Sequence, residues 1–188
     1  MAGPKASLRI RPASPADSDA IARLHHLSHT VCFRSFAPAK WVAARELASY
    51  ERAWREWLAA PPARSRVWIC DEDGAAIAMV CAGPMPAHLP GSDASTAQMR
   101  SMHIRPDRQG RGISRDLWLL VIEFLRTQGY ARTRFDVIEG NMRARRFFAL
   151  AGARVVARSP TGVEGVPIVT YEYGVRSAPG SGAGVAQR

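Results

Sequence analysis

The chain has 188 residues and a formal net charge of +10 at pH 7, and 47% of its residues are hydrophobic. This length fits one domain with a core large enough to be stable alone. The apolar runs are too short to cross a bilayer and the N-terminus has no apolar signal-peptide segment, so we expect no membrane partner. Three widely spaced cysteines without a Cys-x-x-Cys pair argue against a disulfide framework and favour the cytoplasm.

The excess of positive charge comes mainly from arginine and fits two kinds of partner. A basic surface attracts the phosphate backbone of nucleic acids, but here the basic residues are dispersed and we find no nucleic-acid-binding motif. A polyanionic cofactor in a basic cleft explains the same charge. We therefore expect no nucleic-acid partner, and a basic nucleic-acid-binding module remains as an alternative.

In the first half of the chain, residues 7–11 predict a short strand. Ser14 and Pro15 supply the capping and first-turn residues of a helix that continues to Leu27. Residues 41–58 carry apolar side chains at helical spacing and predict a second helix. Three further strands are expected, with a hairpin turn between the first two: residues 67–70, 76–82 and 97–104.

In the second half, an apolar stripe predicts a helix over residues 117–125. A strand, a helix and two last strands are expected after it, at residues 132–138, 142–150, 154–157 and 167–173. This order predicts one α/β domain over residues 7–173, with a mixed sheet that has helices on both faces. We expect residues 1–6 to be disordered and the Gly/Ala/Ser-rich residues 174–188 to form a flexible tail.

The turn between the strand at 97–104 and the next helix carries a phosphate-binding pattern. It reads Arg105-Pro-Asp-Arg-Gln-Gly-Arg-Gly-Ile-Ser-Arg115. Gly110 and Gly112 allow a sharp turn and close approach of a ligand, and the first amides of a helix point outward without partners. Three arginines add positive charge: Arg108, Arg111 and Arg115. The pattern predicts a phosphorylated ligand at this turn.

Three kinds of phosphate loop can be compared with this turn. A Walker A loop requires a Lys that is missing here. The dinucleotide fingerprint requires a third Gly where this chain has Arg115. The segment Gln109-Gly-Arg-Gly112-Ile-Ser114 instead resembles the acyl-CoA loop of the GCN5-related N-acetyltransferases (GNAT), Gln/Arg-x-x-Gly-x-Gly/Ala. Ser114 replaces the final small residue.

A second motif extends this resemblance. The family pattern Asn-x-x-Ala-x-x-Phe-Tyr-x-x-x-Gly-Phe is matched in register at four positions: Asn141, Ala144, Phe147 and Gly152. The resemblance is sharp over residues 97–157. It implies a single-domain acyl-CoA N-acyltransferase fold, with a mixed, mostly antiparallel sheet of about seven strands and helices on both faces.

The resemblance also implies a co-substrate, acetyl-CoA, and the residues that bind it. Backbone groups of three strand residues would pair with the pantetheine arm: Met102, His103 and Ile104. Amides of the turn would hold the pyrophosphate: Gln109, Gly110, Arg111, Gly112, Ile113 and Ser114. Asn141 would bond to the arm or cap the following helix, and both roles are compatible.

Two departures from the family pattern concern proton transfer. The usual Tyr that protonates the leaving thiolate is replaced by Phe148, and a phenyl ring donates no proton. The usual basic Glu of the fourth strand corresponds to Gln98. His103 and Glu139 are the candidates to replace these groups, with an ordinary strand histidine and an ordinary loop carboxylate as the alternatives.

Histidines in the first helix raise the question of a metal. His25 and His29 stand one helical turn apart, as metal ligands often do. Cys32 is the one further ligand type nearby in the pattern. We interpret these histidines as surface or site-lining residues and expect no metal.

The resemblance implies an enzyme that moves an acetyl group from acetyl-CoA to a primary amine of a small molecule or peptide, by direct attack in a ternary complex. The departures at Phe148 and Gln98 motivate an alternative, a catalytically weak acyl-CoA-binding or regulatory domain. The expected acceptor wall is rich in aromatic residues, most of which we assign to core packing. Its acidic residues are few: Glu46, Glu51 and Glu56. A homodimer is compatible with the sequence.

Overall fold

The computed structural model describes residues 8–163 and 165–175. It shows one seven-stranded sheet of order β1-β2-β3-β4-β5-β7-β6, which confirms the expected α/β fold class. The strands are β1 (Leu8–Pro12), β2 (Arg66–Glu72), β3 (Ala75–Pro84), β4 (Thr96–Ile104), β5 (Arg132–Ile138), β6 (Arg154–Val163) and β7 (Val166–Gly174). All neighbouring strands in it are antiparallel except β4 and β5, which are parallel.

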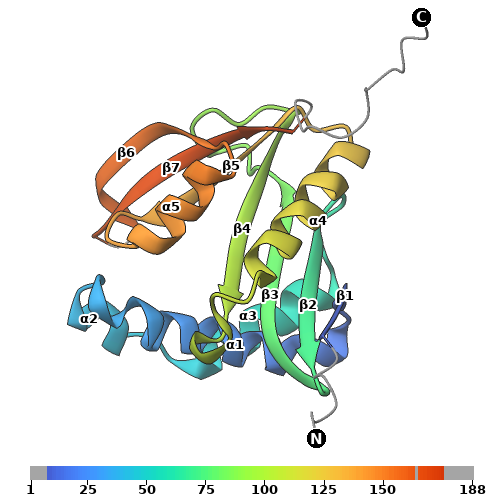
Figure 1. Cartoon of the computed structure of the whole chain (residues 1–188), viewed down its shortest axis with the longest axis vertical. Coiled ribbons are helices and arrows are strands. Elements are labelled where there is room, and N and C mark those ends of the chain that lie inside the picture. The colour runs from blue at the N-terminus through green and yellow to red at the C-terminus, as the bar shows by residue number, and fades with distance from the viewer. Residues whose placement is uncertain (1–7, 164, 176–188) are drawn as a thin grey trace, which may run out of the picture.

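Helices cover both faces of this sheet (Figure 1). They are α1 (Ser18–Thr30), α2 (Ala39–Ala43), α3 (Leu47–Ala59), α4 (Ile113–Thr127) and α5 (Met142–Leu150). One core cluster joins α1 and α3 to β2 and β3, and the other joins α4 and α5 to the opposite face. Within residues 8–163 and 165–175, none of the helices has the length and apolarity that a membrane span requires.

Apolar periodicity accounts for this packing. Leu117, Val121 and Leu125 follow the helical repeat on α4 and are completely buried, as the stripe predicted. Ile21 on α1 is equally buried on the other side of the sheet. β3, between the two layers, is buried on both faces from Ile77 onward. The centre of the sheet is therefore a rigid support for the strands beside it.

Several predicted boundaries are wrong, including the start of α4, which lies at Ile113 and not at residue 117. The helix expected over residues 41–58 is split into α2 and α3, because Glu46 has an extended backbone (φ −96°, ψ 128°). β6 continues beyond the expected end at residue 157, because its hairpin with β7 adds pairs as far as Val163. Gly174 still belongs to β7 and Val175 is buried, so neither is part of the expected tail, whose other residues lie outside the described ones. The expected disorder of residues 1–6 lies outside the described residues.

The two halves of the sheet separate at β4 and β5, as Figure 1 shows. These strands pair only where Thr96–Gln98 face Arg132–Arg134. Beyond Gln98 they diverge, which leaves the β5-facing edge of β4 without a neighbouring strand. This divergence opens a V in the sheet.

A bulge in β4 lies where the V begins. Cys81 of β3 faces Ser101, whereas the next residue, Ala82, faces Met99. Arg100 is therefore an extra residue in β4, and such a residue locally bends a strand and increases its twist. The bulge helps to turn β4 away from β5.

Candidate active site

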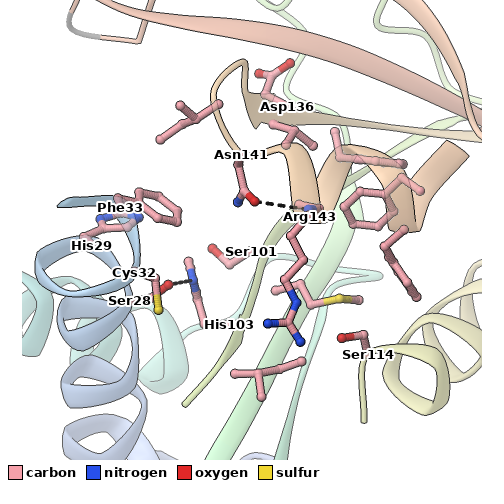
Figure 2. A pocket seen from close by; sticks show the side chains of 18 of the residues that line it. Ser28, His29, Cys32, Phe33, Ser101, His103, Ser114, Asp136, Asn141 and Arg143 are labelled. Atoms are coloured by element: carbon pink, nitrogen blue, oxygen red, sulfur yellow. Dashed lines mark hydrogen bonds between the residues drawn. The ribbon is translucent and has the colours of Figure 1, made fainter. Parts of the chain in front are cut away.

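The V between β4 and β5 holds a cleft of about 930 Å³. Figure 2 shows side chains entering it from α1, from β4 and from the start of α5. Gly110, Gly112 and Ser114 lie at one end. His29 and Phe33 line the side formed by α1 and the turn after it. The cleft thus brings together the motifs that the sequence singled out.

The glycine turn has the backbone that its sequence predicts. Gly110 and Gly112 have φ angles of 84° and 86°, in the left-handed region that glycine adopts without strain. Gly112 is the residue before α4, and its carbonyl accepts from the amides of Arg115 and Asp116. The amides of Ile113 and Ser114 are too early in the helix to have intrahelical partners. They form an anion site at the positive end of the helix dipole.

The arginines of the turn do not all face this anion site. Arg108 forms an ion pair with Glu72 of β2, and Arg111 lies 3.4 Å from the other oxygen of that carboxylate. Arg111 does not line the cleft, and the side chain of Ile113 is buried in the core. Arg115 does line it. The expectation that three arginines surround the anion is therefore wrong for two of them, which tether the turn to β2.

Arg143 of α5 supplies a positive charge that the sequence analysis missed. Its Nη1 donates to Gln109 Oε1 at 2.9 Å, and its Nη2 lies 3.5 Å from where a Cβ on Gly110 would stand. Gln109 also donates to the carbonyl of Ile104 at 3.3 Å. The Gln109 side chain therefore joins β4, the glycine turn and α5 at the mouth of the V.

Asn141 and Phe148 belong to the second motif. The Asn141 side chain caps α5, because its Oδ1 accepts from the amide of Ala144 at 3.1 Å (Figure 2). Asn141 also lines the cleft, so the capping role leaves the ligand role open. Phe148 is 6% exposed and packs against Trp118 and Phe135 at the base of the cleft. It offers a ring and no proton at this place.

Three imidazoles meet on the α1 side of the cleft, and we call them the imidazole box: His25 and His29 of α1, and His103 of β4. One ring nitrogen of each lies within 4.8 Å of the others. The Nδ1 atoms have three different partners: Trp54 Nε1 for His25 (3.1 Å), Tyr50 Oη for His29 (2.6 Å) and Ser28 Oγ for His103 (2.9 Å). Figure 2 shows the pair of Ser28 and His103.

Burial keeps the imidazole box neutral at pH 7. It lowers the pKa of His25 to about 4 and that of His29 to about 3. His103 is also buried, and desolvation lowers its pKa well below the usual value. Nearby positive charge adds to this effect: neighbouring imidazoles act on His29 and His103, and Arg45 acts on His25 and His29.

The imidazole box is compact enough for a metal ion, but its hydrogen bonds oppose that role. The indole N–H of Trp54 can only donate, so His25 Nδ1 accepts and the ring proton is on Nε2. A metal requires an unprotonated ring nitrogen. The hydrogen bond from Trp54 therefore supports the expectation of a site that works without a metal.

Gln98, which stands where the family usually has a basic Glu, and the candidate Glu139 lie in different parts of the structure. Gln98 lines the cleft where β4 and β5 still pair. Glu139 follows β5 and does not line the cleft, and its carboxylate forms an ion pair with Arg158 at 2.7 Å. His103 is thus the candidate proton-transfer residue that lies in the cleft, and Glu139 has a structural partner outside it.

The sequence profile of the acetyltransferase (GNAT) family matches residues 29–153, more than half of the chain and all of the glycine turn. The chain belongs to the acetyltransferase (GNAT) family. No curated protein sequence matches it.

Solved structures share this GNAT fold. The acetyltransferase yncA of Salmonella typhimurium, solved with its cofactor acetyl-CoA, has a TM-score of 0.72 and 19% identity, over 94% of this chain and 98% of that one. The PaiA N-acetyltransferase of Thermoplasma acidophilum, solved with coenzyme A, has a TM-score of 0.71 and 14% identity, over 89% of this chain and 99% of that one. A GCN5-related N-acetyltransferase of Kribbella flavida has a TM-score of 0.69 and 24% identity, over 89% of this chain and 97% of that one.

Proposed function

We propose that this chain transfers an acetyl group from acetyl-CoA to a primary amine of a small molecule or peptide, by direct attack in a ternary complex. One observation carries the proposal: the unpaired edge of β4 leads directly into the glycine turn along one continuous cleft. An extended arm that ends in a pyrophosphate fits such a site, because the edge offers strand-like hydrogen bonds and the turn offers amides.

In this proposal the donor lies along β4. Amides of Gln109 to Ser114 bind the pyrophosphate, and Arg115 and Arg143 supply charge to it. Backbone groups of Met102–Ile104 hold the pantetheine arm, as an added strand would be held. The side chain of Ile113 and that of Arg111 take no part, and only their amides are offered to the ligand. Phe148 and Asn141 contact the arm from the α5 side.

The proposed chemistry needs orientation more than strong acids or bases. The amine lone pair attacks the thioester carbon, and an amide of β4 near the bulge stabilises the oxyanion. The Nε2 of His103 accepts a hydrogen bond from the attacking N–H, with Ser28 fixing the ring. The thiolate leaves without a dedicated acid, because a thiol with a pKa of about 8.5 is a fair leaving group. We assign no proton transfer to Glu139, whose carboxylate is paired with Arg158.

The cytoplasm is the proposed location, since Cys32, Cys70 and Cys81 are all free. We propose no nucleic-acid partner, and part of the arginine content serves the fold. Many arginines form ion pairs with carboxylates: Arg11, Arg105, Arg108, Arg126, Arg132, Arg134 and Arg158.

The test is thiol release from acetyl-CoA with a panel of primary amines, together with the affinity for coenzyme A. We expect coenzyme A to bind and thiol release to depend on an amine. Tight binding without release on any amine would favour the second candidate, a catalytically weak acyl-CoA-binding domain, which Phe148 and Gln98 motivate. Absence of coenzyme A binding would refute both.

A further inference from the structure

A second cavity of about 680 Å³ lies between α1, α3 and β4. It shares four residues with the cleft: His25, His29, Arg100 and Ser101. The two spaces therefore meet at the imidazole box and at the bulge of β4, where the acetyl group is proposed to lie. A small acceptor in the second cavity would reach the thioester past these imidazoles.

The wall that such an acceptor meets is made of closely packed rings. The centroid of His25 lies 4.4 Å from those of His29 and His103. Tyr50 lies 4.8 Å from His25, and Phe33 lies 4.8 Å from His29. This wall therefore has aromatic surface and hydrogen-bonding nitrogens, and it carries no charge at pH 7.

The charges nearest to this wall are mostly positive. Arg45 and Arg100 line the second cavity. Arg45 also lies over the Trp41 ring, 4.1 Å from its centroid, so a guanidinium already occupies the aromatic face that a cationic ligand would use. Burial raises the pKa of the Cys32, Tyr50 and Cys81 groups near the box and the second cavity, so they are uncharged at pH 7. Glu46 is exposed, and Nε2 of the half-buried His26 lies 3.0 Å from the carbonyl oxygen of Arg45.

Carboxylates are scarce on this side of the site. Glu46 is the one acidic residue among the described residues that line the second cavity, and it is exposed to solvent. Asp136 lines the cleft from β5, where it accepts from Thr170 at 2.7 Å, on the wall opposite the box (Figure 2). An ammonium ion at the box would lose its hydration without gaining a carboxylate partner, which is costly.

We infer that the acceptor is a weakly basic primary amine, which passes the imidazole box as the free base. This inference rests on the proposed acetyl transfer and names its substrate class. An α-amino group, with a pKa of about 8, is partly a free base at neutral pH, whereas an alkylamine such as the Lys side chain, at about 10.4, is not. Aromatic amines, α-amino amides and peptide N-termini belong to the favoured class.

The transfer then balances without an enzyme base that must hold a charge. The nitrogen lone pair forms the C–N bond, and the C–S bond breaks with its electron pair on sulfur. The nitrogen loses one proton and the thiolate gains one, directly or through water. The products are the amide and free coenzyme A. His103 contributes by accepting a hydrogen bond from the amine N–H.

The first test is the pH dependence of kcat/KM between pH 6 and 9 for 2-phenylethylamine and for 2,2-difluoro-2-phenylethylamine, which is similar in size and much less basic. For the first amine we expect an increase of about tenfold per pH unit, in proportion to its free base. For the second we expect a plateau above its own lower pKa. A flat profile for 2-phenylethylamine, or a break at one common enzyme pKa for both amines, would overturn the inference.

The second test needs no turnover. It compares two inhibitors of the same shape: trimethyl(2-phenylethyl)ammonium, and its neutral isostere with carbon in place of nitrogen. We expect the neutral compound to compete with the amine at least tenfold better, about 1.4 kcal/mol. Equal or better inhibition by the cation would contradict a site that selects uncharged ligands.

A variant pair localises the effect. His29→Glu places a carboxylate in the wall, and His29→Gln keeps it neutral. We expect the Glu variant to accept the ammonium form, so that its slope of kcat/KM against pH becomes at least threefold shallower, while the Gln variant keeps the wild-type slope. Equal slopes in both variants would show that the box does not select the free base. If His29→Glu does not fold, the pH profiles and the inhibitor pair, both measured on the wild-type protein, still test whether the site selects the free base.

The failure of this inference is distinguishable from failure of the proposed function. Thiol release that depends on an amine but has a flat pH profile would reject only the substrate class. Coenzyme A binding without release on any amine would reject the transfer itself.

Discussion

The glycine turn and the imidazole box line different parts of one cleft and are built in different ways. In the proposed function the turn binds through backbone amides, and its geometry requires two positive φ angles and the first turn of α4. The box is made of side chains from α1 and β4, fixed by partners on α1 and α3. The difference teaches that the proposed donor site depends on local backbone shape, whereas the proposed acceptor side depends on the tertiary fold.

The largest effect that tests this comparison is the loss of folding stability, measured as the free energy of unfolding, as the pH falls. The imidazoles titrate near pH 6.5 in the unfolded chain, but His25 titrates at about 4 and His29 at about 3 in the folded protein. Between these values the unfolded chain binds more protons, so stability is full above pH 6.5 and is lost as the pH falls. For His25 alone we expect a loss of about 3 kcal/mol.

Chemical denaturation at several pH values between 7 and 4 measures this loss. His25→Gln should make the curve shallower, whereas His88→Gln, which changes an exposed loop histidine, should not. An unchanged curve in His25→Gln would mean that the box does not carry the acid sensitivity.

On the donor side, Gly112→Val should weaken coenzyme A binding roughly 30-fold, or about 2 kcal/mol. A branched side chain is strained at φ 86°, and the turn would have to move away from the phosphate. Calorimetric titration with coenzyme A measures the change. The matched control is Gly129→Val, which has φ 80° and open space but lies at the end of α4. Similar Kd changes in both variants would refute the turn as the phosphate site.

At the base of the cleft, Phe148→Tyr should raise kcat about tenfold, because a hydroxyl could protonate the leaving thiolate. The expected effect is below the roughly 100-fold or more that is typical of general acids, since a thiolate already leaves readily. Steady-state thiol release measures it, with an unchanged Kd for coenzyme A. Phe124→Tyr, on α4 and outside the cleft lining, is the control. An unchanged kcat in Phe148→Tyr would show that thiolate departure does not limit the rate.

The smallest expected effect is that of Arg143→Ala, about fivefold weaker coenzyme A binding, or roughly 1 kcal/mol. Arg143 is exposed, so solvent and salt screen its charge. The difference from wild type should shrink further at high salt. Arg146→Ala, another exposed arginine of α5, should leave the Kd unchanged. A loss as large as that of Gly112→Val would make side-chain charge, rather than backbone amides, the main source of donor affinity.

The geometry of the glycine turn could be predicted from sequence because its signals are local. Gly110, Gly112 and Gln109 lie next to one another in the chain, and the capping role of Asn141 follows from its position before a helix. The predicted stripe at Leu117 and neighbouring positions likewise needed only the helical repeat. Family resemblance then supplied the ligand, which spacing alone left open among several phosphates.

The acceptor side could not be predicted, because its contacts join distant segments. Ser28 and His103 are 75 positions apart, and their hydrogen bond depends on how α1 packs on the sheet. The spacing of His25 and His29 was visible and His103 was a separate candidate, but their meeting in one cluster was not. The same reason explains the wrong expectation for the side chain of Arg111. Its partner Glu72 is the last residue of β2, 39 positions earlier in the chain. The break before α3 at Glu46 carries no Gly or Pro signal.

The tether between Glu72 and the two arginines of the glycine turn has a kinetic consequence. Glu72 is largely buried and holds the turn to β2, so the turn needs little ordering when a ligand arrives. We expect coenzyme A to associate in one fast step without a slow closing phase. Releasing the tether with Glu72→Gln should therefore slow association while leaving the bound complex similar.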